Sequence, residues 1–257
     1  MAAAVQASRR RFGLFAILRI IVRVFAMVVL LLACLLPYYL FALLRLRNPW
    51  PRTFLAGICW IAGVQIRVSG ERPKGSAFLI ANHVSWIDIP AIAQGTGSAF
   101  VGHDGLASVP LIKHLCAMND TVFIARHDRA SVHRQVEDVR RAIRDTGALT
   151  IFPEGTTSDG TGLLPFKSSL LSALEPVPEN VRVVPVLLDY GAEAASLAWV
   201  GEEHGVDNFL RILARRRPVV VTMTFCQPLS GEQVRDRKTM AAAARDALSA
   251  SFRTAAA

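Results

Sequence analysis

The first 70 residues of this 257-residue chain contain no aspartate and no glutamate. Nine of the 29 basic residues are arginines in this segment, which leaves 20 basic residues to balance the 20 acidic ones elsewhere. The net charge of +9 therefore lies beside the apolar N-terminus. Such a distribution fits anionic lipid headgroups better than nucleic acid. We expect membrane lipids as partners and no nucleic acid.

Other absences exclude classes of chemistry. No G-x-S-x-G sequence is present, which disfavours a serine hydrolase. No three histidines, cysteines or acids have the spacing of a zinc site, so we expect no metal and no other cofactor. The four cysteines lie in apolar surroundings and predict buried free thiols in a reducing compartment. They are Cys34, Cys59, Cys116 and Cys226.

Residues 1–63 predict a basic membrane anchor with one long and one short apolar helix. The long one, 24–44, has 21 residues without a charge and as a helix would be about 31 Å long, close to one hydrocarbon core. It is too long, and its flanks too basic, for a cleaved signal peptide. Pro37 predicts a kink. The second stretch, 54–66, is too short to span.

Two arrangements of this anchor fit the sequence. The long helix either crosses the membrane once, or both helices dip into one leaflet and return. Arginines flank the long helix on both sides, so the excess of positive charge does not choose an orientation. We favour the two-helix arrangement, in the inner or cytoplasmic membrane, with the rest of the chain, 64–257, on the cytoplasmic side.

From residue 64 onward, short apolar runs alternate with helical patterns, which predicts one α/β domain over 64–257. Such alternation is typical of a mostly parallel central sheet, here of about seven strands, covered by helices. The predicted strands are 64–69, 77–82, 99–103, 121–125, 148–152, 181–188 and 219–226. The predicted helices are 86–94, 109–117, 129–145, 166–174, 207–215 and 231–253.

The stretch AFLIANHVSWID at 77–88 predicts a strand that leads into a helix. Asn82 and His83 follow the apolar run, and Ser85 to Asp88 has the S-x-x-D pattern of a capping box. Ligands bind at this end of the strands in open α/β sheets. His83 can remove a proton from a hydroxyl, and Asp88 can orient its ring. A turn histidine beside a helix cap remains the alternative.

A second stretch, IFPEGTTSDG at 151–160, also follows a predicted strand. Gly155 lets the backbone approach a ligand closely. The hydroxyls and amides of Thr156 and Thr157, with Glu154 beside them, suit phosphate oxygens or a hydroxyl. An ordinary turn is the alternative.

Two further features carry predictions. Arg126, at the end of the run 122–126, can clamp a phosphate with two hydrogen bonds, or simply pair with Asp128. Pro185 lies inside the strand 181–188, which predicts an edge strand or a bulge.

Four blocks of the sequence resemble the glycerophospholipid acyltransferase family, which contains the 1-acylglycerol-3-phosphate acyltransferases. N-H-V-S-W-I-D at 82–88 resembles the first block, and F-P-E-G-T at 152–156 resembles the third. V-F-I-A-R at 122–126 and V-V-P-V at 183–186 resemble the second and fourth, of which the fourth is linked in the family to the acyl donor. The first and third blocks together are specific. The resemblance covers roughly 64–229.

The resemblance implies catalysis by His83 and Asp88 and acceptor binding by Arg126, Glu154 and Gly155. The hydroxyl chemistry of Thr156 and Thr157 adds these two residues to the predicted acceptor site. The expected reaction moves a fatty acyl group from acyl-CoA or acyl-carrier protein to 1-acylglycerol 3-phosphate, forming phosphatidic acid. A phosphate-free lysolipid such as lyso-ornithine lipid is the alternative acceptor, because the family often has arginine at Thr157 and lysine and glutamate at His103 and Gly105. A thioesterase and a basic membrane-binding protein without turnover remain the other classes.

Overall fold

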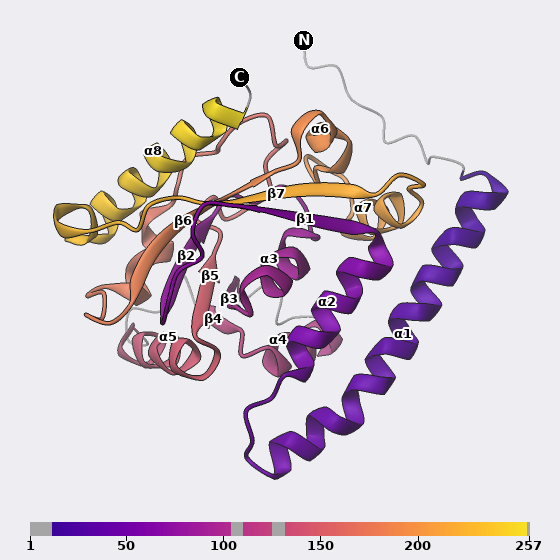
Figure 1. The fold of residues 1–257 in the computed structure, drawn as a ribbon, viewed down its shortest axis with the longest axis horizontal. Helices are drawn as coiled ribbons and strands as arrows, with labels where there is room; N and C mark the ends of the chain where they lie inside the picture. The colour runs from indigo at the N-terminus through magenta and orange to yellow at the C-terminus, as the bar shows by residue number, and fades with distance from the viewer. Residues whose placement is uncertain (1–11, 104–109, 125–131, 256–257) are drawn as a thin grey trace.

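The structure is a computed structural model that describes residues 12–103, 110–124 and 132–255 of the chain. Its centre is a seven-stranded sheet with the order β1-β7-β6-β2-β5-β3-β4 (Figure 1). Neighbouring strands run parallel, except that β6 and β7 are antiparallel. The strands are β1 (Val64–Ser69), β2 (Ala77–Ala81), β3 (Ala99–His103), β4 (Val122–Ile124), β5 (Ala148–Ile151), β6 (Arg182–Asp189) and β7 (Val219–Phe225).

The predicted fold class is confirmed. Each of the seven predicted strands is present, and each lies within one residue of its predicted bounds. Helices cover the sheet, as expected, and an apolar helical segment precedes it (Figure 1).

The N-terminal segment is a pair of helices, α1 (Leu14–Leu43) and α2 (Trp50–Ala62), that lie side by side (Figure 1). α1 starts ten residues before the predicted apolar segment and continues through Pro37. It includes Arg19 and Arg23, whose guanidinium groups donate to backbone carbonyls of residues 213–215. α2 ends at Ala62, where Gly63 adopts the left-handed conformation with φ of 78° that glycine tolerates best.

The remaining helices largely match their predicted positions. Segment 166–174 is instead a short 3₁₀ helix, η3, which Pro176 prevents from continuing beyond Glu175. The predicted helix 231–253 is divided in two. Ser230 caps η5 with a capping box, and Asp236 accepts hydrogen bonds from two backbone amides at the start of α8. The helices are α3 (Asp88–Thr96), α4 (Pro110–Met118), α5 (Val132–Thr146), η3 (Ser168–Leu174), η4 (Gly191–Glu193), α6 (Ala194–Leu197), α7 (Gly205–Leu213), η5 (Gly231–Val234) and α8 (Arg237–Ala255).

Two hydrophobic cores lie on the two faces of the sheet. In β2, Leu79 and Ala81 point into a core shared with α1, α2, α3 and α7. Phe78 and Ile80 point into a core shared with α5, η3 and α8. This alternation follows from the two-residue period of a strand. The C-terminal end of β2 is therefore held in the middle of the domain, buried on both faces.

Pro185 does not lie in an edge strand, so the edge alternative is wrong. The pairing around it has the one-residue offset of a bulge, because Val186 pairs with Phe225 whereas Val183 pairs with Leu229. Its strand, β6, lies between β2 and β7. The proline is accommodated because the ladder with β7 starts only at Val186, which pairs with Phe225. The Pro185 carbonyl accepts a hydrogen bond from the Cys226 amide at 2.9 Å, and the amide hydrogen that proline lacks is not needed beyond the end of β7.

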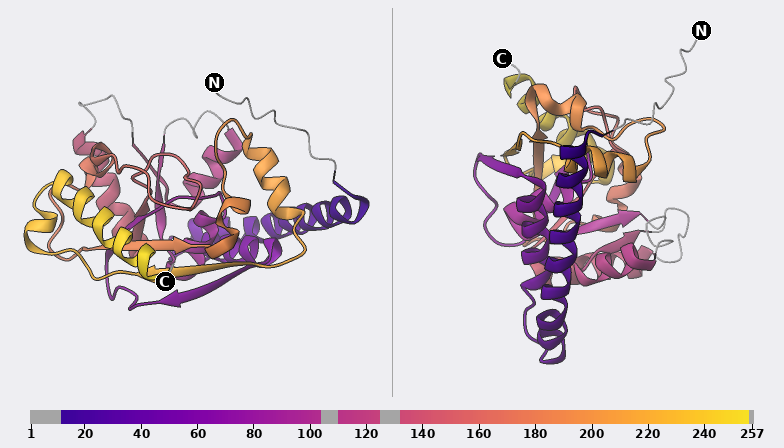
Figure 2. Two further views of the ribbon diagram at one scale, coloured as in Figure 1. Left: turned by 90° about the horizontal axis from the view of Figure 1, so that it is seen from above. Right: turned by 90° about the vertical axis from the view of Figure 1, so that its right-hand side faces the viewer.

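α1 exposes an apolar face along its whole length and is tied to the domain near both ends. In the described part of the chain it is the helix long and apolar enough to cross a membrane. Near its start, Arg19 and Arg23 bind carbonyls at the end of α7. Near its end, the Tyr39 hydroxyl lies 2.9 Å from Nε2 of His114 on α4. Figure 2 shows α1 along one side of the domain.

Candidate active site

The end of β2 is fixed by the side chain of Asn82. Its Nδ2 donates to the Leu188 carbonyl at 3.0 Å, and its Oδ1 accepts from the Leu188 amide at 2.7 Å. The amide side chain thus continues the pairing of β2 with β6 beyond Ala81. His83 consequently leaves the sheet from a fixed position.

His83 and Asp88 meet as the spacing predicts. Oδ2 of Asp88 lies 2.7 Å from Nδ1 of His83 and also accepts from the amides of Val84 and Ser85 at 2.6 and 2.9 Å. The predicted capping box is only half formed. Helix α3 begins at Asp88, and the Ser85 hydroxyl donates to Oδ1 of Asn208 instead of capping it.

This geometry defines the protonation of the pair. A carboxylate only accepts hydrogen bonds, so Nδ1 of His83 carries the proton that is donated to Asp88. Nε2 then holds the lone pair of the neutral ring. The His83 side chain is 18% exposed, whereas that of Asp88 is fully buried. The pair can therefore present a base to a substrate while its carboxylate stays out of water.

Tyr190 completes the shell around Asp88. Its hydroxyl donates to Oδ1 of Asp88, the oxygen that His83 does not use. Burial, and then the neighbouring Asp88 charge, raise the pKa of Tyr190 well above its ordinary value. The tyrosine therefore remains a proton donor to the carboxylate. Tyr190 was not predicted, because no local pattern connects it with a residue 102 positions earlier.

The second predicted stretch lies against the first. The Ser158 amide donates to the His83 carbonyl at 2.7 Å, and the Ser158 hydroxyl also approaches that carbonyl, at 3.1 Å. The ring of Phe152 stacks on His83 with 4.2 Å between ring centroids. Gly160 has φ of 72°, and a Cβ there would lie 2.8 Å from the Cβ of Ala194. These contacts hold the two stretches together.

Glu154 is buried beneath this junction and does not line the cavity described below. The backbone amides of His83 and Leu164 lie near enough to favour its charged form, but neither carboxylate oxygen completes a hydrogen bond within the described residues. Burial, with the nearby charge of Asp88, raises the pKa of Glu154 to about 8. The side chain is thus mostly neutral at pH 7.

An apolar cavity of about 660 Å³ opens beside His83. Gly155, Thr156 and Thr157 line it together with His83, and α1, α2 and α4 supply much of its apolar wall. Its described lining includes no lysine and no arginine, and its one acidic residue is Glu203. Apolar lining residues include Leu31, Phe54, Leu55, Ile89, Phe100, Leu115, Met118 and Val200. Such a cavity suits a long hydrocarbon chain.

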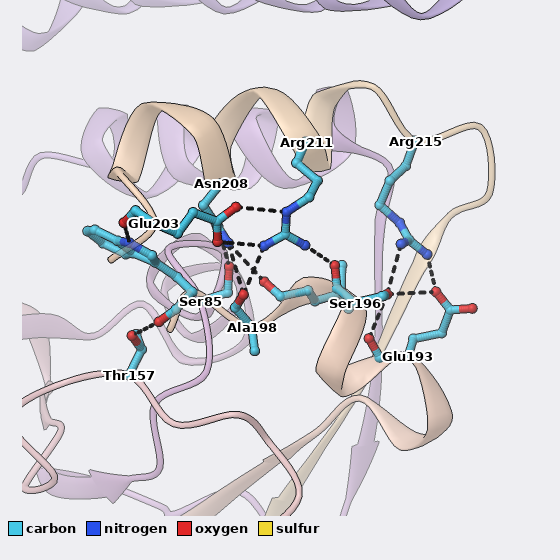
Figure 3. A network of polar contacts seen from close by, with 11 residues as sticks. Ser85, Thr157, Glu193, Ser196, Ala198, Glu203, Asn208, Arg211 and Arg215 are labelled. Atoms are coloured by element: carbon cyan, nitrogen blue, oxygen red, sulfur yellow. Dashed lines mark hydrogen bonds and ion pairs between the residues drawn. The ribbon is translucent and has the colours of Figure 1, made fainter. Parts of the chain in front are cut away.

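The segment 199–203 forms another wall of the cavity, and a polar network fixes it (Figure 3). Arg211 binds both carboxylate oxygens of Glu203 at 2.9 and 2.8 Å. Asn208, fully buried, donates to Glu203 and to two carbonyls, at Leu197 and Ala198.

The same network reaches both predicted stretches. Asn208 accepts from the Ser85 hydroxyl, and the Thr157 hydroxyl donates to the Trp199 carbonyl (Figure 3). The Trp199 amide also donates to the Val84 carbonyl at 2.9 Å. Helix α7 therefore contacts the turn after His83 through the Ser85 side chain, and segment 199–203 contacts the same turn through the backbone.

Sequence reasoning located part of this site. Arg126 and Gly105 lie outside the described residues, and His103 is the last residue of β3. The predicted residues that meet at the cavity are His83, with Asp88 behind it, and Gly155, Thr156 and Thr157. The structure adds Asn82, Ser158, Tyr190 and Asn208. Of these, Asn82 and Ser158 lay within the two stretches that the sequence singled out, 77–88 and 151–160.

Within the described residues, no three histidine, cysteine or acidic side chains gather as a metal site. All four cysteines are free; Cys34 and Cys59 are buried, and Cys116 and Cys226 are half-buried. Burial raises the pKa of the Cys59 thiol to about 12 and that of the other three thiols by less. None of them is primed as a nucleophile.

Comparisons with known proteins agree with this geometry. A family model described as Acyltransferase matches residues 65–189. A lyso-ornithine lipid O-acyltransferase of Rhizobium meliloti is 31% identical over 210 residues, which cover 76% of this chain and 72% of the relative. A 1-acyl-sn-glycerol-3-phosphate acyltransferase of Neisseria gonorrhoeae is 35% identical over 128 residues, 48% of each chain.

A solved structure has the same fold. The crystal structure of the 1-acyl-sn-glycerophosphate acyltransferase PlsC from Thermotoga maritima matches with a TM-score of 0.66 over 95% of each chain. Sequence identity is 20%, so this likeness concerns the fold alone.

Proposed function

Because this chain belongs to the glycerophospholipid acyltransferase family, we propose that it transfers a fatty acyl group from acyl-CoA or acyl-carrier protein to the hydroxyl of a lyso-ornithine lipid. The chain is an acyltransferase with lipid substrates. The observation that carries the proposal is the His83–Asp88 pair, in which His83 lines an apolar cavity. The choice of acceptor rests on the arguments below.

In this proposal, Nε2 of His83 removes the proton from the acceptor hydroxyl as the oxygen attacks the thioester carbonyl. The new C–O bond forms, the C–S bond breaks, and the departing thiolate takes the proton from Nε2 of His83, so a lipid ester, a free thiol and the neutral His83 ring result. Asp88 orients His83 and stabilises the imidazolium. General base catalysis of this kind typically contributes about 10²–10⁴-fold.

The acceptor is argued from charge. A phosphate monoester is best bound by arginine or lysine, and the described lining of the cavity contains neither. Thr157, where the family often has arginine, uses its hydroxyl to bind the Trp199 carbonyl. An ornithine headgroup has no phosphate, and its carboxylate is offset by its own ammonium group. The relative from R. meliloti, similar over most of this chain, supports the same choice. The predicted acceptor, 1-acylglycerol 3-phosphate, becomes the second candidate.

The two ties of α1 to the domain support the dipping arrangement of the anchor. A helix held by Arg19 and Arg23 near one end and by Tyr39 near the other lies along the domain. We therefore place α1 and α2 in one leaflet, with residues 64–257 on the cytoplasmic face, where acyl-CoA and acyl-carrier protein are found.

The first experiment measures thiol release from oleoyl-CoA by purified protein with lyso-ornithine lipid, with 1-acylglycerol 3-phosphate, and without acceptor. We expect release that depends on lyso-ornithine lipid and is lost in His83→Ala. His204→Ala, an exposed histidine that does not line the cavity, is the matched control and keeps its activity.

Each other outcome rejects a part of the proposal. Faster release with 1-acylglycerol 3-phosphate rejects the acceptor but keeps the chemistry. Release without acceptor indicates a thioesterase. No release with any acceptor, or equal release by His83→Ala, rejects the assignment of His83.

A further inference from the structure

Arginines from two distant parts of the sequence meet at one end of α1. Nη1 of Arg19 donates to the Ala214 carbonyl at 2.5 Å. Nη1 of Arg23 donates to the carbonyls of Leu213 and Arg215 at 2.9 and 3.1 Å. These carbonyls end α7, and the turn that follows is Arg215-Arg216-Arg217. We call Arg19, Arg23 and Arg215 to Arg217 the arginine corner.

The corner concentrates positive charge that few acids offset. Burial, with the charge of Arg19, lowers the pKa of Arg23. Arg215 is paired with Glu193, as Figure 3 shows. Arg216 and Arg217 are exposed on the turn before β7. Crowding guanidinium groups costs free energy unless an anion is nearby, so the corner is suited to a polyanionic partner.

The exposed apolar face of α1 continues directly into this corner. Leu14, Phe15, Leu18, Ile21, Val22 and Phe25 are all more than half exposed on the first turns of the helix. An apolar helical face bordered by arginines is typical of a segment that lies in the membrane interface. The arginine corner thus lies beside the exposed apolar face of α1.

We propose that the arginine corner binds anionic phospholipid headgroups, so that the catalytic domain itself contacts the membrane through the α7–β7 turn. The sequence does not suggest this, because residues beyond 70 are neutral in total. Folding gathers Arg215 to Arg217 against Arg19 and Arg23. The contact adds a second point of attachment beside the helix pair and fixes which side of the domain faces the bilayer.

The test uses partition of the full-length protein from neutral detergent micelles onto vesicles. One set is phosphatidylcholine alone, and the other is an equal mixture of phosphatidylcholine and phosphatidylglycerol. Because each arginine near an anionic surface contributes about fivefold, R216Q/R217Q should partition roughly 30-fold more weakly onto the anionic vesicles. Its partition onto neutral vesicles should not change, and high salt should remove the difference.

The matched control is R141Q/R144Q, which removes the same charge from exposed positions on α5. It should partition like the natural protein. The proposal is overturned if R216Q/R217Q partitions normally, or if the control loses as much. Normal partition with a raised KM for acyl-carrier protein would assign the corner to that acidic protein. Because partition is measured without substrate, its result does not depend on the proposed acceptor.

Discussion

The Asp88 carboxylate is fully buried, yet no lysine or arginine pairs with it in the described structure. Its charge is instead balanced by four hydrogen-bond donors: the His83 ring, two backbone amides and the Tyr190 hydroxyl. A carboxylate that accepts several such bonds is stabilised in its charged form. Tyr190 therefore contacts the proposed acid–base pair through Asp88, and it does not line the cavity.

Tyr190→Phe should lower kcat about tenfold or more with little change in KM. The lost hydrogen bond to a charged group contributes about 1.5–3 kcal/mol, and each 1.4 kcal/mol is a factor of ten in rate. In an Asp88→Asn background the same substitution should cost little further activity, because the two residues act as a unit. If the fold-losses in kcat of the two single variants multiply in the double variant, Tyr190 acts independently of Asp88 and only supports the core.

Glu154 makes a prediction about pH and stability. Its pKa is about 8 in the folded protein and 4.5 in the ordinary case, so between these values the folded state holds more protons than the unfolded state. The free energy of unfolding should consequently fall as pH rises from about 4.5 to about 8, by at most roughly 5 kcal/mol.

Thermal unfolding of natural and Glu154→Gln protein across this pH range measures the effect. The glutamine variant, which cannot ionise, should show the flatter profile. Parallel profiles would mean that the folded protein accommodates the Glu154 charge at no cost.

Sequence reasoning succeeded at the residue scale where the partners were local. His83 and Asp88 are five positions apart and belong to one strand–turn–helix unit, so their spacing predicts their contact. Tyr190 and Asn208 reach the same turn from more than 100 positions away. The pairing of β6 with β2 brings Tyr190 to this turn, and the packing of α7 brings Asn208. No local sequence pattern predicts these two long-range contacts.

At the scale of elements, strands were predicted better than helix ends. Buried parallel strands are continuous apolar runs whose borders are easily recognised, and β2 is buried at all five positions. Helix ends depend on which side chain caps them. The sequence pattern predicted Ser85 as a helix cap, but its hydroxyl binds Asn208. Asp236 caps the start of α8 and was not predicted.

Gly57 allows the close packing of α1 against α2. A Cβ at this position would lie 2.4 Å from Cδ2 of Leu30. Gly57→Val should therefore lower the free energy of unfolding by about 1–3 kcal/mol through overpacking. Adding Leu30→Ala should recover part of this loss.

Thermal unfolding of both single variants and the double variant in detergent forms the cycle that checks this. The double variant has to be more stable than the sum of the two single changes in unfolding free energy predicts. Strict additivity would mean that the two helices separate freely at this point.

At the scale of the whole molecule, the cavity was beyond sequence reasoning because its walls come from α1, α2, α4, the turn after β5 and segment 199–203. Taken alone, the sequence of each of these segments indicates only a packed helix or a turn. Only their assembly leaves an apolar space beside His83. The same assembly decides how the molecule meets the membrane, since the cavity wall and the exposed apolar face belong to one helix, α1.

That arrangement gives a last prediction. If α1 lies in one leaflet, a cysteine at Gly13, before its first turn, is on the same side of the membrane as one at Glu232, an exposed residue of the catalytic domain. With labelling of the natural cysteines subtracted, an impermeant maleimide should label both variants in inverted vesicles and neither in intact spheroplasts. Labelling of Gly13→Cys in spheroplasts would mean that α1 crosses the membrane. Crossing would require the bonds of Arg19 and Arg23 to α7 to break, since these bonds hold the start of α1 against the domain.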